Sequence, residues 1–312
     1  MKTISLVIPC YNEQEVLAEL FAKLEEITKE LSSYKFELVF VNDGSRDNTQ
    51  SILNDYLSTN PDAKIVEFSR NFGKEPAMSA GLEHASGDAV IPIDADLQDP
   101  PELIAQMIEK WEQGAMVVLA RRANRSSDTF MKRLTASLFY KLHNQMASVK
   151  IPENVGDFRL MDRDVVDAIN QLPERLRFMK GLFAWVGYDA VTIDYVRAER
   201  SAGDTKFSGS KLWNFALEGI TSFSAMPLKI WTYFGIVVAL SCLGYAIYTL
   251  IATLIFGIDV PGYASLLIFV LFFGSMNMIG VGIIGEYIGR IYLETKARPL
   301  YIVKKLHQSG ED

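Results

Sequence analysis

Residues 89–98 read Ala-Val-Ile-Pro-Ile-Asp-Ala-Asp-Leu-Gln, an apolar run that stops at two aspartates one residue apart. A short apolar run with polar flanks predicts a buried strand. Three similar runs precede it, and each leads into a segment with apolar residues at helical spacing. The strands are expected at residues 4–8, 36–41, 63–68 and 89–93, and the helices between them at residues 16–27, 48–57 and 76–84. This alternation predicts an α/β domain with right-handed crossovers and a mostly parallel, doubly wound sheet.

Polar residues gather where these strands end, which is where such sheets bind their ligands. They are residues 9–13 (Pro-Cys-Tyr-Asn-Glu), residues 42–45, and the pair Asp94 and Asp96 with Gln98. Oxygen ligands suit Mg²⁺ or Mn²⁺, and three histidines in the whole chain make a nitrogen site a poor rival. An isolated Asp-x-Asp pair is more often a solvated turn. Its place after the fourth strand favours a metal-bound diphosphate instead.

Two polar segments further along the chain carry cations. After a helix at residues 101–113 and a strand at residues 116–120, residues 121–125 read Arg-Arg-Ala-Asn-Arg, and residues 200–206 form a polar loop. Residues 71–75 (Asn-Phe-Gly-Lys-Glu) offer one lysine but no glycine pattern of an ATP-binding loop, which disfavours an ATPase.

Charge and cysteine content exclude several classes of protein. The net charge of the chain is −7, with −8 on residues 1–228 and +1 on the remainder. The negative charge of residues 1–228 argues against non-specific nucleic-acid binding. Cys10 and Cys242 are the only cysteines, so neither a disulfide framework nor a zinc site is expected. The first strand begins without an apolar signal segment, so the first domain is expected in the cytosol.

Two long runs near the C-terminus contain no charged residue. Residues 230–258 are the first and residues 260–285 the second, and each exceeds the roughly 20 residues that cross a bilayer core. The loop at residues 257–262 has no Lys or Arg, whereas both flanks do, so both chain ends are expected in the cytoplasm. A helical hairpin buried in a soluble core is the alternative.

The chain therefore divides into three expected parts. Residues 1–228 form a cytosolic domain that ends in an amphipathic interfacial helix at about 210–226, residues 229–290 hold transmembrane helices at about 230–257 and 263–286, and residues 291–312 form a cytosolic tail.

Six segments, in this order, carry a family resemblance: PCYNE, VNDGSRDNT, NFGKE, DADLQDPPE, GDFRL and RSAGDTKFSGSKL. With the hairpin behind them, they resemble the glycosyltransferases of family 2 that load polyisoprenyl phosphates, which include the dolichol-phosphate mannose synthases and the bactoprenol glucosyltransferases. The stretch GDFRLMDRDVVDAINQLPERLRFMKGL, residues 156–182, is most similar to the bactoprenol branch.

The resemblance implies a fold, a reaction and a location. The fold is the nucleotide-diphosphosugar transferase (GT-A type) α/β domain, and the enzyme is a metal-dependent, inverting hexosyltransferase using Mg²⁺ or Mn²⁺. It would transfer glucose from UDP-glucose to undecaprenyl phosphate and release UDP. As a multi-pass protein of the bacterial inner membrane, it would act with a separate flippase and a second transferase, as in O-antigen glucosylation. A homo-oligomer is left open.

The resemblance also assigns site residues. The donor would be bound by Pro9, Tyr11, Glu13, Asp43, Asp94, Ala95, Asp96, Gln98, Arg200 and Lys206. The metal would be held by Asp94, Asp96 and Gln98, and the acceptor phosphate by Arg122 and Arg133. Asp157, Asp96 and Arg200 would be catalytic. Many relatives have Ser-Lys where this chain has Asp204-Thr205-Lys206, which is a departure in the loop that closes on the diphosphate.

Asp157 stands where the family's proposed base lies. A phosphate monoester has its second pKa near about 6, so the acceptor is mostly a dianion at neutral pH. We therefore expect Asp157 to orient the acceptor rather than deprotonate it.

Three other functions are weighed against this interpretation. A processive polysaccharide synthase would carry a Gln-x-x-Arg-Trp segment, which this chain lacks. The same lipid could receive another sugar, such as mannose or aminoarabinose. A non-catalytic scaffold that binds a nucleotide sugar is disfavoured, because Asp94, Asp96, Asp157 and Arg200 occur together.

Overall fold

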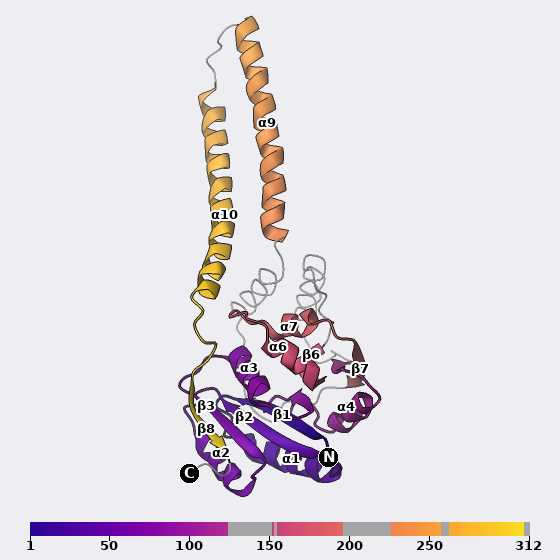
Figure 1. The fold of residues 1–312 in the computed structure, drawn as a ribbon. Coiled ribbons are helices and arrows are strands. Elements are labelled where there is room, and N and C mark those ends of the chain that lie inside the picture. The colour runs from indigo at the N-terminus through magenta and orange to yellow at the C-terminus, as the bar shows by residue number, and fades with distance from the viewer. Residues whose placement is uncertain (124–151, 153–154, 196–225, 257–261, 309–312) are drawn as a thin grey trace.

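The computed structural model describes residues 1–123, 152, 155–195, 226–256 and 262–308. A layered α/β domain and two long helices that extend away from it make up this part of the chain (Figure 1). The strands are β1 (Thr3–Cys10), β2 (Lys35–Asn42), β3 (Ala63–Phe68), β4 (Ala89–Pro92), β5 (Val117–Arg122), β6 (Val155–Asp162), β7 (Ala190–Tyr195) and β8 (Val303–Gln308). The helices are α1 (Leu17–Glu30), α2 (Thr49–Thr59), α3 (Lys74–His84), α4 (Leu103–Glu112), α6 (Arg163–Asn170), α7 (Met179–Trp185), α9 (Met226–Phe256) and α10 (Tyr263–Thr295).

The sheet has eight strands in the order β7-β5-β6-β4-β1-β2-β3-β8. β4, β1, β2 and β3 are parallel neighbours, as the alternation of strands and helices predicted. β6 runs antiparallel to both β4 and β5, and β7 is parallel to β5. Because β6 runs against β4, its first residues lie at the edge of the sheet where β4 ends. The predicted α/β fold with a mostly parallel sheet is confirmed.

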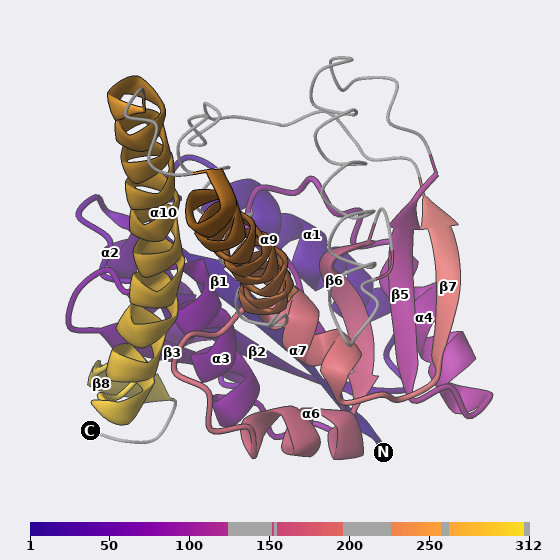
Figure 2. The same cartoon turned by 90° about the horizontal axis from the view of Figure 1, so that it is seen from above.

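Helices cover both faces of the sheet, so its central strands are buried on each side. One core joins β1, β2 and β4 to α1, α2 and α4. The other joins the opposite faces of these strands to α3, α6 and α7 (Figure 2). Cys10 is buried in the first core, where it packs as a small apolar residue.

The end of the chain returns to the sheet as β8, which was not expected from the sequence. β8 pairs antiparallel with β3 and so covers that edge of the sheet. Glu67 of β3 accepts from Lys304 Nζ at 2.5 Å and lies 3.0 Å from His307 Nε2. Tyr301 stacks on Phe68, with ring centroids 4.8 Å apart. Residues 303–308, within the segment expected as a cytosolic tail, therefore add a strand to the sheet.

Helices α9 and α10 form the expected hairpin, with residues 257–261 between them outside the described part. Near the α/β domain the two helices touch, because a Cβ added to Gly280 would lie 2.3 Å from Trp231 Nε1. At the same end, Glu294 accepts from the backbone N–H groups of Arg175 and Leu176. Among the residues described here, no helix combines the length and the apolar character needed to cross a membrane. The expected interfacial helix at 210–226 lies almost wholly outside the described residues.

Candidate active site

The loops that follow β1, β2, β3 and β4 converge at one edge of the sheet. Two residues in these loops have left-handed backbone conformations although neither is glycine: Asn12 at φ 54° and Leu97 at φ 55°. A left-handed conformation at a residue other than glycine lowers the free energy of unfolding by about 1–3 kcal/mol, and it persists where the surrounding structure fixes it. Asn12 is fixed from both sides, because its N–H donates to Ser45 Oγ and its Oδ1 accepts from Arg46 N. The first two loops are thereby joined.

Three of the residues expected to bind the donor lie at the end of β1 and in the loop that follows it. Pro9 is in β1 and pairs with Val41 of β2. Tyr11 and Glu13 follow it and are half-buried, and the Glu13 N–H donates to Thr49 Oγ1 at 2.9 Å.

Asp43 holds the loop that leads into α3. Its carboxylate accepts from the N–H of Phe72 at 2.6 Å and of Gly73 at 2.9 Å. Burial raises the pKa of Asp43 above its usual range, while these two donors act in the opposite direction. Next to it, Gly44 has φ 62°, and a Cβ there would lie 2.3 Å from the carbonyl carbon of Arg70. Asp43 therefore positions the start of α3, a role that sequence reasoning did not foresee.

Lys74, the first residue of α3, joins two carboxylates. Its Nζ lies 2.7 Å from Asp94 Oδ1 and 2.9 Å from Asp157 Oδ2. Burial alone would lower the pKa of Lys74, but Asp157 and Asp94 hold it above its usual range. Burial likewise opposes ionisation of Asp157, and the ammonium groups of Lys74 and Lys180 outweigh it, so the pKa of Asp157 lies below its usual range. Lys74 and Asp157 are therefore both charged at neutral pH.

The environment of Glu75, the next residue, disfavours its ionised form. Burial and repulsion from Asp157 raise the pKa of Glu75 to about 7. Its Oε2 accepts from the N–H of Met179, the first residue of α7, at 3.0 Å. The first turn of α3 therefore places one cation between Asp94 and Asp157 and one carboxyl group beneath α7.

The expected metal ligands, Asp94, Asp96 and Gln98, lie in the segment that follows β4. Asp94 and Asp96 follow β4, Ala95 between them is buried, and the buried Gln98 donates its N–H to Asp96 Oδ1 at 3.2 Å. Within the described residues, no cluster of three His, Cys, Asp or Glu side chains forms a ready metal site. Carboxylate and amide oxygens are the donor types that Mg²⁺ and Mn²⁺ prefer, and both oxygens of Asp94 already contact one cation, the Lys74 ammonium.

Arg122, expected at the acceptor phosphate, lies at the end of β5. Its Nε donates to the Tyr195 hydroxyl at 3.4 Å, and that hydroxyl donates to the buried Asp99 at 2.9 Å. Arg133, Arg200 and Lys206 lie outside the described residues.

Sequence comparison assigns two parts of the chain to known families. Residues 5–169 match the family described as glycosyl transferase family 2. The chain belongs to this family. Residues 226–291 match a second family, described as the GtrB C-terminal hairpin. The two matches cover the sheet domain through most of α6 and nearly all of α9 and α10.

Relatives of similar length strengthen this family 2 assignment. A protein of Escherichia coli named prophage bactoprenol glucosyl transferase homolog is 57% identical over 303 residues, which cover 97% of this chain and 99% of the relative. The bactoprenol glucosyl transferase of Shigella phage SfII is 56% identical over 307 residues, 98% of this chain and 99% of the relative. An uncharacterized glycosyltransferase of Synechocystis is 54% identical over 303 residues, 97% of this chain and 95% of the relative.

Solved structures resemble the chain more distantly. Mannosyl-3-phosphoglycerate synthase of Rubrobacter xylanophilus has a TM-score of 0.47 at 16% identity, over 70% of this chain and 71% of that one. Glucosyl-3-phosphoglycerate synthase of Mycobacterium tuberculosis, crystallised with Mn²⁺, UDP and phosphoglyceric acid, has a TM-score of 0.45 at 20% identity, over 70% and 76% of the two chains.

The site of this family 2 enzyme contains residues that the sequence analysis did not assign. Lys74 and Glu75 were noted only as part of the segment 71–75, and Asp99 was not singled out. The signal for Lys74 was available, because residues 71–75 follow the third strand at the same edge of the sheet. The contact between Lys74 and Asp157 could not be predicted from the sequence. It forms because β6 runs antiparallel to β4, which brings Asp157 to the same end of the sheet as Lys74.

Proposed function

We propose that the protein transfers glucose from UDP-glucose to undecaprenyl phosphate, with inversion, at the cytosolic face of a bacterial inner membrane. The observation that carries this proposal is that Lys74 contacts both Asp94 and Asp157. This group lies where the parallel strands end, which is where a doubly wound sheet binds its ligand. Relatives that are 57% and 56% identical over nearly the whole chain and carry bactoprenol glucosyl transferase names support the choice of sugar and acceptor.

The donor is proposed to lie across the loops after β1, β2 and β4. Pro9, Tyr11, Glu13 and Asp43 would hold the nucleoside, and the carboxylates of Asp94 and Asp96 with the Gln98 amide would hold Mg²⁺ or Mn²⁺. Bound there, the metal supplies charge neutralisation for the leaving UDP. Arg200 and Lys206 would add cations to the same diphosphate.

Asp157 is proposed to orient the acceptor. Its pKa lies below the usual range of a carboxyl group, whereas a phosphate monoester has its second pKa near about 6. Each unit of difference makes proton transfer from the phosphate about 1.4 kcal/mol less favourable. The acceptor dianion, held by Arg122 and Arg133, would therefore attack the anomeric carbon directly. Asp157 would keep Lys74 and the acceptor in place.

The hairpin is proposed to cross the membrane twice, with both chain ends in the cytosol. Large apolar side chains on both helices are exposed, including Leu254 at 77% and Phe256 at 85%. Contiguous exposed apolar surface of this kind is typical of a membrane or protein interface. The acceptor's chain stays in the bilayer while its phosphate must reach the site, so an anchored enzyme suits it. The division at residues 228 and 290, the interfacial helix, the flippase, the second transferase and a homo-oligomer remain part of this proposal.

The test is transfer from a panel of radiolabelled UDP- and GDP-sugars to undecaprenyl phosphate in detergent, with Mg²⁺ or Mn²⁺. We expect labelled lipid from UDP-glucose alone, and none from the Asp96→Ala variant. Label from a GDP-sugar or from another UDP-sugar would keep the reaction class and change the sugar. Labelled lipid from no donor would overturn the proposal and favour a non-catalytic role.

A further inference from the structure

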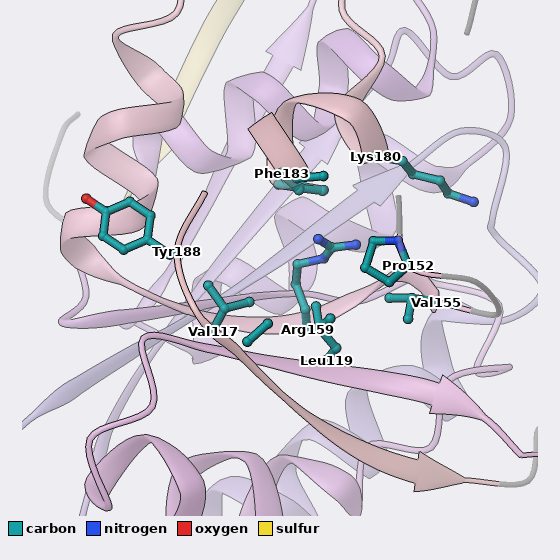
Figure 3. A pocket seen from close by; sticks show the side chains of 10 residues that line it. Val117, Leu119, Pro152, Val155, Arg159, Lys180, Phe183 and Tyr188 are labelled. Carbon is teal, nitrogen blue, oxygen red and sulfur yellow. The ribbon is translucent and has the colours of Figure 1, made fainter. Parts of the chain in front are cut away.

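A cavity of about 160 Å³ lies between α7 and the outer strands β5 and β6 (Figure 3). Its walls are largely apolar, with Val117 and Leu119 from β5, Val155 from β6 and Phe183 from α7. Two cations, Arg159 and Lys180, also line it. Among the described residues that line the cavity, none is acidic. The site therefore offers positive charge beside apolar surface.

Arg159 is buried and incompletely bonded. Only 6% of the residue is exposed, its Nη2 donates to the Gly156 carbonyl at 2.7 Å, and its guanidinium lies 4.0 Å from the Phe183 ring centroid. Its buried Nε has no hydrogen-bond partner within the described structure. Burial lowers the pKa of Arg159 to about 10, so the group stays charged at neutral pH. A buried guanidinium is costly unless an opposite charge compensates it, and an oxyanion in the cavity would supply that charge.

The cavity adjoins the active site. Side chains alternate along a strand, so Arg159 projects from the same face of β6 as Asp157. Lys180 is close enough to Asp157 to stabilise its charge. On the other side of the strand, a Cβ added to Gly156 would lie 3.7 Å from Arg122 Nη2. Arg122 and Arg159 thus flank Gly156, directly before Asp157.

We propose that this cavity is part of the acceptor site, with Arg159 and Lys180 binding the acceptor phosphate and the apolar wall contacting the first carbons of its chain. This inference rests on the proposed function and extends its acceptor site beyond Arg122 and Arg133. Two cations suit a phosphate dianion, and no acidic side chain is among the described residues that line the cavity itself. The apolar wall suits a hydrocarbon chain better than a sugar phosphate, whose hydroxyl groups would lose hydrogen bonds there.

Lys180 gives the sharper test, because the buried Arg159 is harder to replace without affecting folding. Lys180→Gln removes one charge from the cavity rim, and Lys110→Gln on α4, at the opposite face of the sheet, is the matched control. We expect Lys180→Gln to raise the KM for farnesyl phosphate about tenfold, as for one lost charge-assisted hydrogen bond. The KM for UDP-glucose should stay within about twofold in both variants.

Binding is measured separately, with tritiated farnesyl phosphate and the full chain in detergent. We expect Lys180→Gln to weaken binding about tenfold and Lys110→Gln to leave it unchanged. Farnesol and inorganic phosphate should each compete poorly, because each supplies only half of the ligand. Competition by inorganic phosphate as strong as by farnesyl phosphate would overturn the lipid assignment. Equal binding by wild type and Lys180→Gln would overturn the site.

The two proposals fail differently. If no donor yields labelled lipid while farnesyl phosphate binding still depends on Lys180, the proposed reaction is wrong and the acceptor site stands. If glucose is transferred and Lys180→Gln has the wild-type KM for the acceptor, the reaction stands and this cavity is not part of its acceptor site.

Discussion

Asp94 and Asp157 share one counter-ion, because Lys74 Nζ lies 2.7 Å from an oxygen of the first and 2.9 Å from an oxygen of the second. The two carboxylates come from different strands, and Asp94 is a proposed metal ligand. A metal bound there must compete with the ammonium for the same oxygens. In the proposed site, Lys74 would therefore couple the metal and donor side to the acceptor side.

This coupling predicts opposite effects of Lys74→Gln on metal binding and on turnover. Without the ammonium, the Kd for Mn²⁺ in the absence of nucleotide should fall about tenfold, equal to about 1.4 kcal/mol. The kcat should fall about 10²-fold, because Asp157 loses its partner. Mn²⁺ titrations followed by electron paramagnetic resonance measure the first effect. Lys74→Arg, which keeps the charge, is the control, and equal Mn²⁺ affinity in wild type and Lys74→Gln would contradict the prediction.

Asp157→Asn should keep a measurable rate. Replacing an orienting residue is expected to lower the rate by less than the roughly 10²–10⁴-fold that follows the loss of a general base. Removing a negative charge near the acceptor also favours the phosphate dianion, so the acid limb of kcat/KM for the acceptor should move to lower pH. Rates between pH 5 and 9 would show both effects. Complete loss of turnover with acceptor binding intact would mean that Asp157 is the base after all.

Glu75 should make the protein less stable as the pH rises. The pKa of Glu75 is about 7 in the folded chain against 4.5 as its ordinary value, so the folded state holds the extra proton between these values. The free energy of unfolding therefore falls as the pH rises from about 4.5 to 7, by up to about 3 kcal/mol. Glu75→Gln keeps an oxygen for the Met179 N–H and removes this titration. We expect a smaller fall in the apparent Tm between pH 5 and 8 for Glu75→Gln, and parallel curves would refute the assignment.

Removing β8 should expose the edge of β3. Truncation after Arg298 deletes Tyr301, the partners of Glu67 and the whole strand, and it leaves unpaired backbone groups that favour aggregation. We expect a lower Tm and a shift to large species in size-exclusion chromatography. Truncation after Gln308 keeps β8 and serves as the control. If the protein truncated after Arg298 were monodisperse and had an unchanged Tm, β8 would be dispensable.

The parts of the fold that follow from local pattern were predictable. The strand before Asp94 is a continuous apolar run, and the strand before Asp43 is apolar from Phe36 to Val41 except at Glu37. The crossover rule then fixes which of their ends meet. β8 was not predictable, because residues 303–308 mix polar and apolar side chains and gain their shape only by pairing with β3. Likewise Lys74 and Asp157 meet through a strand reversal that no short segment encodes.

The position of β8 also sets an order of events during synthesis. Glu67 and its partner His307 are 240 residues apart, and both hairpin helices lie between them. A nascent chain emerges from its N-terminus, so β3 keeps an open edge until residues 303–308 have left the ribosome. The sheet is therefore finished only after the hairpin has been made, and a ribosome stalled before residue 303 would hold a protein with the loops after β1 to β4 present and its sheet incomplete.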